Sequence, residues 1–127
     1  MMLSLPSALK VFALRGETDM RKSFTGLVGL VETQLGQQVE SGHLFLFFNR
    51  RRNSVKVLYF VGDGLVIYYR RLEQGTFELP ERLNSGSESS SAASLELSWS
   101  DLELILSGIE LSSVRRRKRW QPPPRPR

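Results

Sequence analysis

Few side chains in this sequence could carry out a reaction. The chain of 127 residues has no cysteine and a single histidine, His43. The lack of cysteine excludes disulfides and thiolate chemistry, and one histidine is too few for a structural zinc site. His43 stands at the start of a predicted strand, where a hydrogen-bonded structural role is expected and a general base is the alternative.

A metal-dependent nuclease would need several carboxylates that converge on one or two metal ions. The carboxylates considered are Glu17, Asp19 and Asp63. Asp19 precedes an apolar periodic stretch and can cap a helix, while Asp63 lies in a Gly-Asp-Gly turn, so local structure accounts for both. Nuclease activity therefore stays a third hypothesis, which requires the three carboxylates to converge in space.

The cationic side chains are the stronger indication of function. Three adjacent guanidinium groups at 50–52 repel one another, so they are expected to be solvated or to face an anion. Phosphates are bound by such groups without dependence on base sequence. We therefore predict nucleic-acid contacts from Arg50, Arg51, Arg52, Lys56, Arg70 and Arg71.

A second group of cations lies in the C-terminal tail. Residues 113–127 hold seven of the 18 basic residues and no acid, so residues 1–112 carry 11 basic and 13 acidic side chains, a net charge of −2. A basic tail is typical of an electrostatic arm for nucleic acid. The residues predicted to bind there are Arg115, Arg116, Arg117, Lys118 and Arg119, and a merely solvated or partner-binding tail is the alternative.

The elements that must position these cations form a β-meander. Residues 43–49, 54–61 and 65–71 are rich in β-branched and aromatic residues and are separated by turn sequences, which predicts three consecutive antiparallel strands. Because such strands run up, down and up, the first and third end on the same side. The arginines at 50–52 and at 70–71 should therefore lie at one end of the sheet.

A helix is predicted before the meander, from about residue 20 to 35, with Thr18 or Asp19 as its N-cap and Gly36 after its end. Its apolar residues form one stripe. Gly26 and Gly29 lie inside it, and a close approach of the helix to the sheet is the simplest reason for two unfavourable glycines. A short strand is predicted at 11–14.

The region after the meander is predicted to hold a possible fourth strand at 76–79, a flexible low-complexity loop at 84–94, a short strand at 95–97 and a helix at 101–106 capped by Ser100. The fold class is therefore α+β, an antiparallel β-meander packed against one amphipathic helix, with a short second helix and a basic C-terminal tail. Residues 1–112 form one domain, and 113–127 form the proline-rich tail.

No apolar run approaches the roughly 20 residues that cross a bilayer, and no signal peptide is indicated at the N-terminus. We therefore expect a cytoplasmic protein that contacts no membrane. No cofactor is expected.

The sequence resembles a known family over roughly residues 1–119. The resemblance is carried by residues 16–27, 41–52, 56–59, 62–64, 69–77 and 104–111. Together they closely resemble the TnpB accessory protein of the insertion sequence 66 family of bacterial transposable elements, which is distinct from the RNA-guided nuclease of the same letters. Phe60, where the family pattern has tryptophan, is a departure, and residues 84–94 and the proline-rich end look peculiar to this chain.

The resemblance implies a helper protein encoded beside a separate transposase, with no catalytic residues to carry over. The first hypothesis is a non-enzymatic accessory protein of transposition that binds DNA, the transposase of the same element, or both. The second is a protein-interaction module without DNA binding, which an exposed strand edge or apolar patch would favour. The sequence indicates no oligomeric state.

Overall fold

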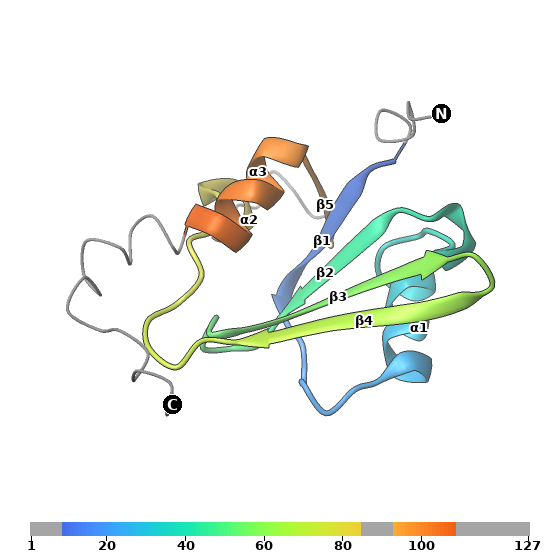
Figure 1. Cartoon of the computed structure of the whole chain (residues 1–127), viewed down its shortest axis with the longest axis horizontal. Coiled ribbons are helices and arrows are strands. Elements are labelled where there is room, and N and C mark those ends of the chain that lie inside the picture. The colour runs from blue at the N-terminus through green and yellow to red at the C-terminus, as the bar shows by residue number, and fades with distance from the viewer. Residues whose placement is uncertain (1–8, 85–92, 109–127) are drawn as a thin grey trace, which may run out of the picture.

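Five strands form one mixed sheet in the order β4-β3-β2-β1-β5 (Figure 1). The computed structural model describes residues 9–84 and 93–108. The strands are β1 (Val11–Glu17), β2 (Leu44–Phe48), β3 (Ser54–Val61), β4 (Gly64–Arg71) and β5 (Ser94–Leu97). The predicted meander is confirmed as β2, β3 and β4, which pair in antiparallel fashion.

β1 is longer than predicted and joins the two halves of the sheet. It pairs in parallel with β2 and in antiparallel fashion with β5. The strand continues past Leu14 to Glu17, through Gly16 at a φ of +91°, and its register with β2 shifts there. A parallel pair needs a crossover connection, and here it contains a helix.

That helix, α1 (Phe24–Thr33), covers one face of the sheet. It begins four residues later than predicted, because Asp19 caps a separate turn and not the helix: the Arg21 N–H donates to Asp19 Oδ1 at 2.9 Å. The N-cap is Ser23, whose side chain makes no capping hydrogen bond. Beyond the helix, Gly36 adopts a φ of +64°, and the short 3₁₀ turn η2 (Val39–Ser41) leads to β2.

The glycines in α1 do not serve a close approach to the sheet, so that prediction is wrong. A Cβ added at Gly29 would meet no atom within 4 Å. One added at Gly26 would lie 3.2 Å from Lys22 Cβ and Cγ, which belong to the preceding turn and not to a strand. The sheet therefore does not require glycine at either position.

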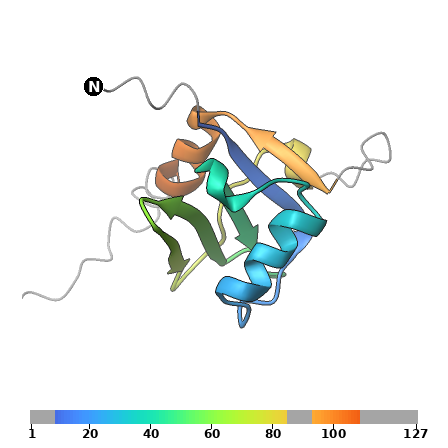
Figure 2. The same cartoon turned by 90° about the vertical axis from the view of Figure 1, so that its right-hand side faces the viewer.

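The opposite face of the sheet is covered by α2 (Glu81–Asn84), α3 (Trp99–Glu103) and one π-helical turn, η3 (Leu104–Gly108). Figure 2 shows α1 and α3 on the two sides of the sheet. The cap of α3 is Ser98, not Ser100 as predicted. Ser98 Oγ accepts from the Asp101 N–H, and the Asp101 carboxylate accepts from the Ser98 N–H, each at 3.0 Å. Because of this reciprocal pair, the helix begins at Trp99, two residues before the predicted start at residue 101.

One other prediction about the C-terminal half was wrong. Residues 76–79 are not a strand, because the Phe77 N–H donates to the Arg52 carbonyl at 2.8 Å and its ring packs edge-on against Phe48. The segment thus crosses the end of the sheet. Of the predicted loop at 84–94, Asn84 instead closes α2 and Ser94 begins β5, and residues 85–92 lie outside the described residues.

Each face of the sheet carries its own apolar core. Leu27 and Val31 of α1 pack on one face, on a set that includes Phe45, Phe47 and Leu58. Ile105 and Leu102 pack on the other, on a set that includes Val11, Ala13, Leu46, Phe48, Val55 and Val57. Because both faces are covered, the middle strands are apolar on both sides.

Candidate nucleic-acid interface

The hairpin tip between β2 and β3 presents three arginines on a well-bonded loop. Asn49 organises it: its Oδ1 accepts from the N–H groups of Asn53 and Ser54 at 3.0 and 2.9 Å, and its Nδ2 donates to Asn53 Oδ1 at 2.7 Å. Arg52 adopts a φ of +61°, a left-handed conformation that the turn requires. Arg50 and Arg51 are therefore held on a defined backbone.

Arg70 and Arg71 lie beside that tip, as the up-down-up argument predicted. Ser54 is opposite Arg71 and Val55 opposite Arg70 in the β3–β4 register. The Leu72 N–H donates to the Asn53 carbonyl at 2.8 Å, which ties the end of β4 to the tip. We call the five arginines gathered there the arginine end: Arg50, Arg51, Arg52, Arg70 and Arg71.

The side chains of the arginine end do not form one uniform surface. Arg70 lies on the α3 face, where its Nη1 donates to the Leu106 carbonyl at 2.9 Å. Arg52 is half-buried, with its guanidinium 5.9 Å from the centre of the Phe48 ring. Arg50, Arg51 and Arg71 are exposed. These three are the members of the arginine end whose charge faces solvent.

Lys56 has a different environment from the one expected of a phosphate ligand. The residue is only 8% exposed, and its Nζ donates to the carbonyl oxygens of Met20 and Lys22 at 2.8 and 2.6 Å. Its ammonium also lies 4.8 Å from the centre of the Tyr69 ring. Lys56 therefore fastens the turn before α1 to the sheet, and we leave it out of the candidate interface.

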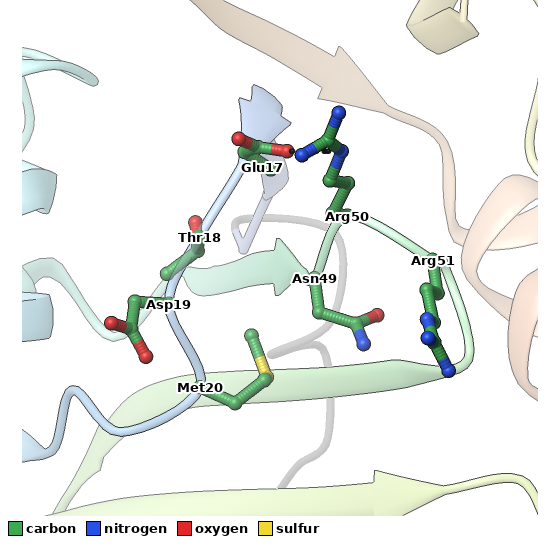
Figure 3. Close-up of a pocket in the computed structure, with 7 residues that line it drawn as sticks. All are labelled: Glu17, Thr18, Asp19, Met20, Asn49, Arg50 and Arg51. Atoms are coloured by element: carbon green, nitrogen blue, oxygen red, sulfur yellow. Dashed lines mark ion pairs between the residues drawn. The ribbon is translucent and has the colours of Figure 1, made fainter.

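An open cleft of about 880 Å³ adjoins the arginine end (Figure 3). Arg50 and Arg51 lie on one side of it and Asp19 on the other, with Asn49 between them. Arg50 Nε is 3.7 Å from Glu17 Oε1, and both side chains remain largely exposed. Such an exposed pair is weak and can exchange Glu17 for another anion.

Asp19 keeps its negative charge at the edge of this cleft. Arg21 Nη2 donates to Asp19 Oδ2 at 2.7 Å and Arg21 Nε to the same carboxylate at 3.1 Å. These bonds, followed by the one from the Arg21 N–H, lower the pKa of Asp19 from 3.8 to about 2. Arg21 balances the charge of that carboxylate, so Arg50 and Arg51 are the cations among the residues that line the cleft.

The carboxylates of the nuclease hypothesis do not converge. Glu17 lies opposite Phe48 at the arginine end, whereas Asp63 lies in the turn between β3 and β4, at the other end of β3. Within residues 9–84 and 93–108, no three histidine, aspartate or glutamate side chains are grouped to hold a metal ion. The geometric condition for that hypothesis is not met by these residues.

His43 has the hydrogen-bonded environment of a structural residue. Its Nδ1 accepts from the Lys10 N–H at 3.0 Å, its own N–H donates to Ser41 Oγ at 3.2 Å, and its ring packs edge-on against Phe12. With Nδ1 occupied as an acceptor, the ring joins the start of β1 to the start of β2.

Sequence reasoning did not identify Asn49 as the residue that positions the arginines. The available signal was an asparagine at the end of an apolar strand, where its side chain commonly caps a turn. The other predicted cations, Arg115 to Arg119, lie outside the described residues. In the part of the chain that the structure describes, no helix is long and apolar enough to cross a membrane.

Comparison with known proteins places this chain in a family. Two relatives are uncharacterised proteins of Sinorhizobium fredii (strain NBRC 101917 / NGR234): y4hO is 32% identical over 84% of this chain and 87% of its own length, and y4jC is 26% identical over 91% and 92%. No solved structure matches. The family model described as IS66 Orf2 like protein matches residues 9–116, and the chain belongs to that family.

Proposed function

We propose that this protein is a non-enzymatic accessory protein of transposition that contacts DNA phosphates through the arginine end. Family membership supports the accessory role. The observation that carries the DNA contact is the display of Arg50 and Arg51 on a loop fixed by Asn49, with exposed Arg71 beside them. The predicted basic tail, Arg115 to Arg119, would add a second set of phosphate contacts.

Binding of this kind depends on salt more than on base sequence. Each phosphate that an arginine neutralises releases condensed counterions, which adds about 0.9 to the slope of log affinity against log salt. Arg50, Arg51 and Arg71 together would therefore account for a slope of about 3. Any preference for the ends of the element would have to come from further contacts, because phosphate contacts carry no sequence information directly.

The test is a fluorescence-anisotropy titration of labelled element-end and scrambled duplexes across a salt series. Arg51→Gln removes one exposed charge at the arginine end, and Lys10→Gln is its matched control, because Lys10 is an exposed cation at the opposite end of β1. We expect Arg51→Gln to weaken binding and to reduce the salt slope by about 1. Lys10→Gln should leave the slope unchanged. Equal effects of both variants would contradict a localised interface.

A second candidate function is docking on the transposase of the same element. The observation that favours it is the exposure of apolar side chains on α3 and η3: Trp99 and Leu104 are 42% and 57% exposed, and Trp99 lines a cleft of about 400 Å³. Surface patches of this kind are typical of protein interaction sites. Co-purification with the transposase should be reduced by Leu104→Ser and not by Val61→Ser, which removes an equally exposed side chain from β3. If neither variant reduced co-purification with the transposase, that result would count against this surface.

A further inference from the structure

The two edges of the sheet differ in how well they are protected against pairing. β5 is short, and its outward side chain Glu96 forms an ion pair with Lys10 at 3.9 Å. β4 has eight residues, of which Gly64 to Tyr69 include no charge and no proline. Natural edge strands are normally kept from association by shortness, charge, proline or bulges. β4 has none of these over six residues, although within the described residues it pairs only with β3.

The exposed side chains of β4 make this edge apolar on both faces. Val66 and Tyr68 are 38% and 40% exposed on the α3 face, and Tyr69 is 50% exposed on the α1 face. Leu65 and Ile67 are half-buried on the α1 face and pack against its core. A partner strand laid along β4 would cover all five residues, which is a large apolar surface for one strand.

The register of the β3–β4 hairpin shows which backbone groups of β4 are available. Gly62, at a φ of +63°, and Asp63 form a two-residue turn closed by the pair Val61 and Gly64. In such a hairpin the closing pair is hydrogen-bonded and the pairs then alternate. The N–H and C=O groups of Leu65, Ile67, Tyr69 and Arg71 therefore point away from β3.

A second copy of β4 fits these groups in one antiparallel register. If Ile67 faces Ile67 of the second copy, then Leu65 faces Tyr69 and Val66 faces Tyr68, and every outward backbone group meets another. Aromatic side chains paired with aliphatic ones are favourable across strands. The two-fold axis passes between the two Ile67 residues, so the Leu65–Tyr69 and Val66–Tyr68 pairs each occur twice.

Charge supports the same register. With Ile67 on the axis, Arg71 of each copy lies opposite Asp63 of the other, and both side chains are exposed. A shift by one residue in each strand, with Tyr68 on the axis, would instead set Asp63 opposite Glu73. We infer that β4 is a self-association edge, through which two copies form one continuous ten-stranded sheet with Ile67 on the two-fold axis.

Disulfide trapping tests the register directly, because the chain has no cysteine of its own. In Ile67→Cys the two introduced thiols would face each other at a Cα separation of about 5.5 Å, which a disulfide can span. In the control Tyr69→Cys, on the same face and edge, the two thiols would be four residues out of register, roughly 14 Å apart. We expect oxidation to give a covalent dimer of the first variant and not of the second.

Charge exchange tests the same contact without a cross-link. Sedimentation equilibrium of the full chain in the absence of DNA should show a dimer that Asp63→Arg or Arg71→Asp weakens by about tenfold or more, since each reversal sets like charges opposite each other twice. The double variant Asp63→Arg, Arg71→Asp should restore association. A monomer at every concentration, equal trapping of both cysteine variants, or a β4 edge that binds only another protein would overturn the proposal.

Discussion

Lys56 shows how a cation that the sequence predicts to bind phosphate can instead have a structural role. Its ammonium is directed to two carbonyl oxygens of the turn before α1, and Tyr69 covers it. A buried cation is tolerated when its hydrogen bonds are satisfied, and their loss is then costly. Lys56 therefore links the sheet to the turn that carries Asp19. Its ammonium is buried and hydrogen-bonded within the protein, whereas Arg51 is exposed to solvent.

Lys56→Met should destabilise the fold without weakening DNA contact at the arginine end. Methionine keeps most of the volume but donates no hydrogen bond, and bonds from charged groups contribute about 1.5–3 kcal/mol each. Because water can reach the carbonyl of exposed Lys22, we expect a total loss of about 2 kcal/mol in urea unfolding. Lys10→Met, at an exposed cation, serves as the control. A reduced salt slope of DNA binding in the folded Lys56→Met protein would show that Lys56 contacts phosphate after all.

Asp19 should make stability depend on pH in the acid range. Its pKa is lowered from 3.8 to about 2 by Arg21, so the ionised carboxylate favours the folded state. This contribution is fully present above about pH 4 and is lost as the pH falls through about 2. The difference in urea midpoint between the native chain and Asp19→Asn should therefore shrink over that interval. The stability of Arg21→Gln should depend on pH in the same way as that of Asp19→Asn. If the difference in urea midpoint between the native chain and Asp19→Asn stayed constant with pH, the Asp19–Arg21 pair would not be the cause of the pH dependence.

At the scale of the elements, α1 is held by packing more than by its own helical propensity. It has two internal glycines, a serine N-cap without a side-chain bond and no acidic residue in its first turn. Leu27 and Val31, both fully buried, account for its position on the sheet. An exposed helix with the same sequence would be marginal in water.

Gly29→Ala should therefore stabilise the protein. A Cβ at Gly29 meets open space, so the gain in helix propensity, about 1 kcal/mol, is not offset by a clash. Gly26→Ala is the matched comparison. Its Cβ would lie 3.2 Å from the side chain of Lys22, which must move aside, so its gain should be smaller. Thermal unfolding followed by circular dichroism measures both, and a loss of stability in Gly29→Ala would show that an unseen contact requires glycine.

The sequence was informative for the meander, where local chemistry decided the structure. Alternating apolar residues and the Gly-Asp-Gly turn predicted β2, β3 and β4 and placed the arginines of the β2–β3 turn at the same end of the sheet as Arg70 and Arg71. Long-range contacts were not accessible in this way. The burial of Lys56 depends on a turn 34 residues earlier in the chain. Phe77 is not in the predicted strand, because its N–H donates to the carbonyl of Arg52. The cap of α3 could have been placed correctly, because Ser98 and Asp101 have the spacing of a reciprocal cap.

The described residues of the molecule form one sheet with a core on each face, and the two cores share the same strands. Leu46 and Phe48 point to one core while Phe45 and Phe47 point to the other. Loss of either core would expose one side of β2. The two layers should therefore unfold together, as small single domains commonly do.

Ile105→Ala and Leu27→Ala test this coupling from opposite faces. Both side chains are fully buried, and truncation of such residues costs about 2–5 kcal/mol. Hydrogen exchange in Ile105→Ala should accelerate at the amides of α1 as much as at those of α3. In Leu27→Ala, hydrogen exchange should accelerate at the amides of α3 as much as at those of α1. Faster exchange confined to the substituted face would show two independent units.

The place of β1 between β2 and β5 has a consequence for synthesis on the ribosome. β1 is translated first, but its outer neighbour β5 follows about 80 residues later. At roughly 5–20 residues per second, the nascent chain would wait about 4–16 s with the outer edge of β1 open. During that interval the apolar surface destined for Ile105 would be available to chaperones and to neighbouring nascent chains. Rare codons between residues 17 and 94 should therefore lower the yield of folded protein more than rare codons after residue 108.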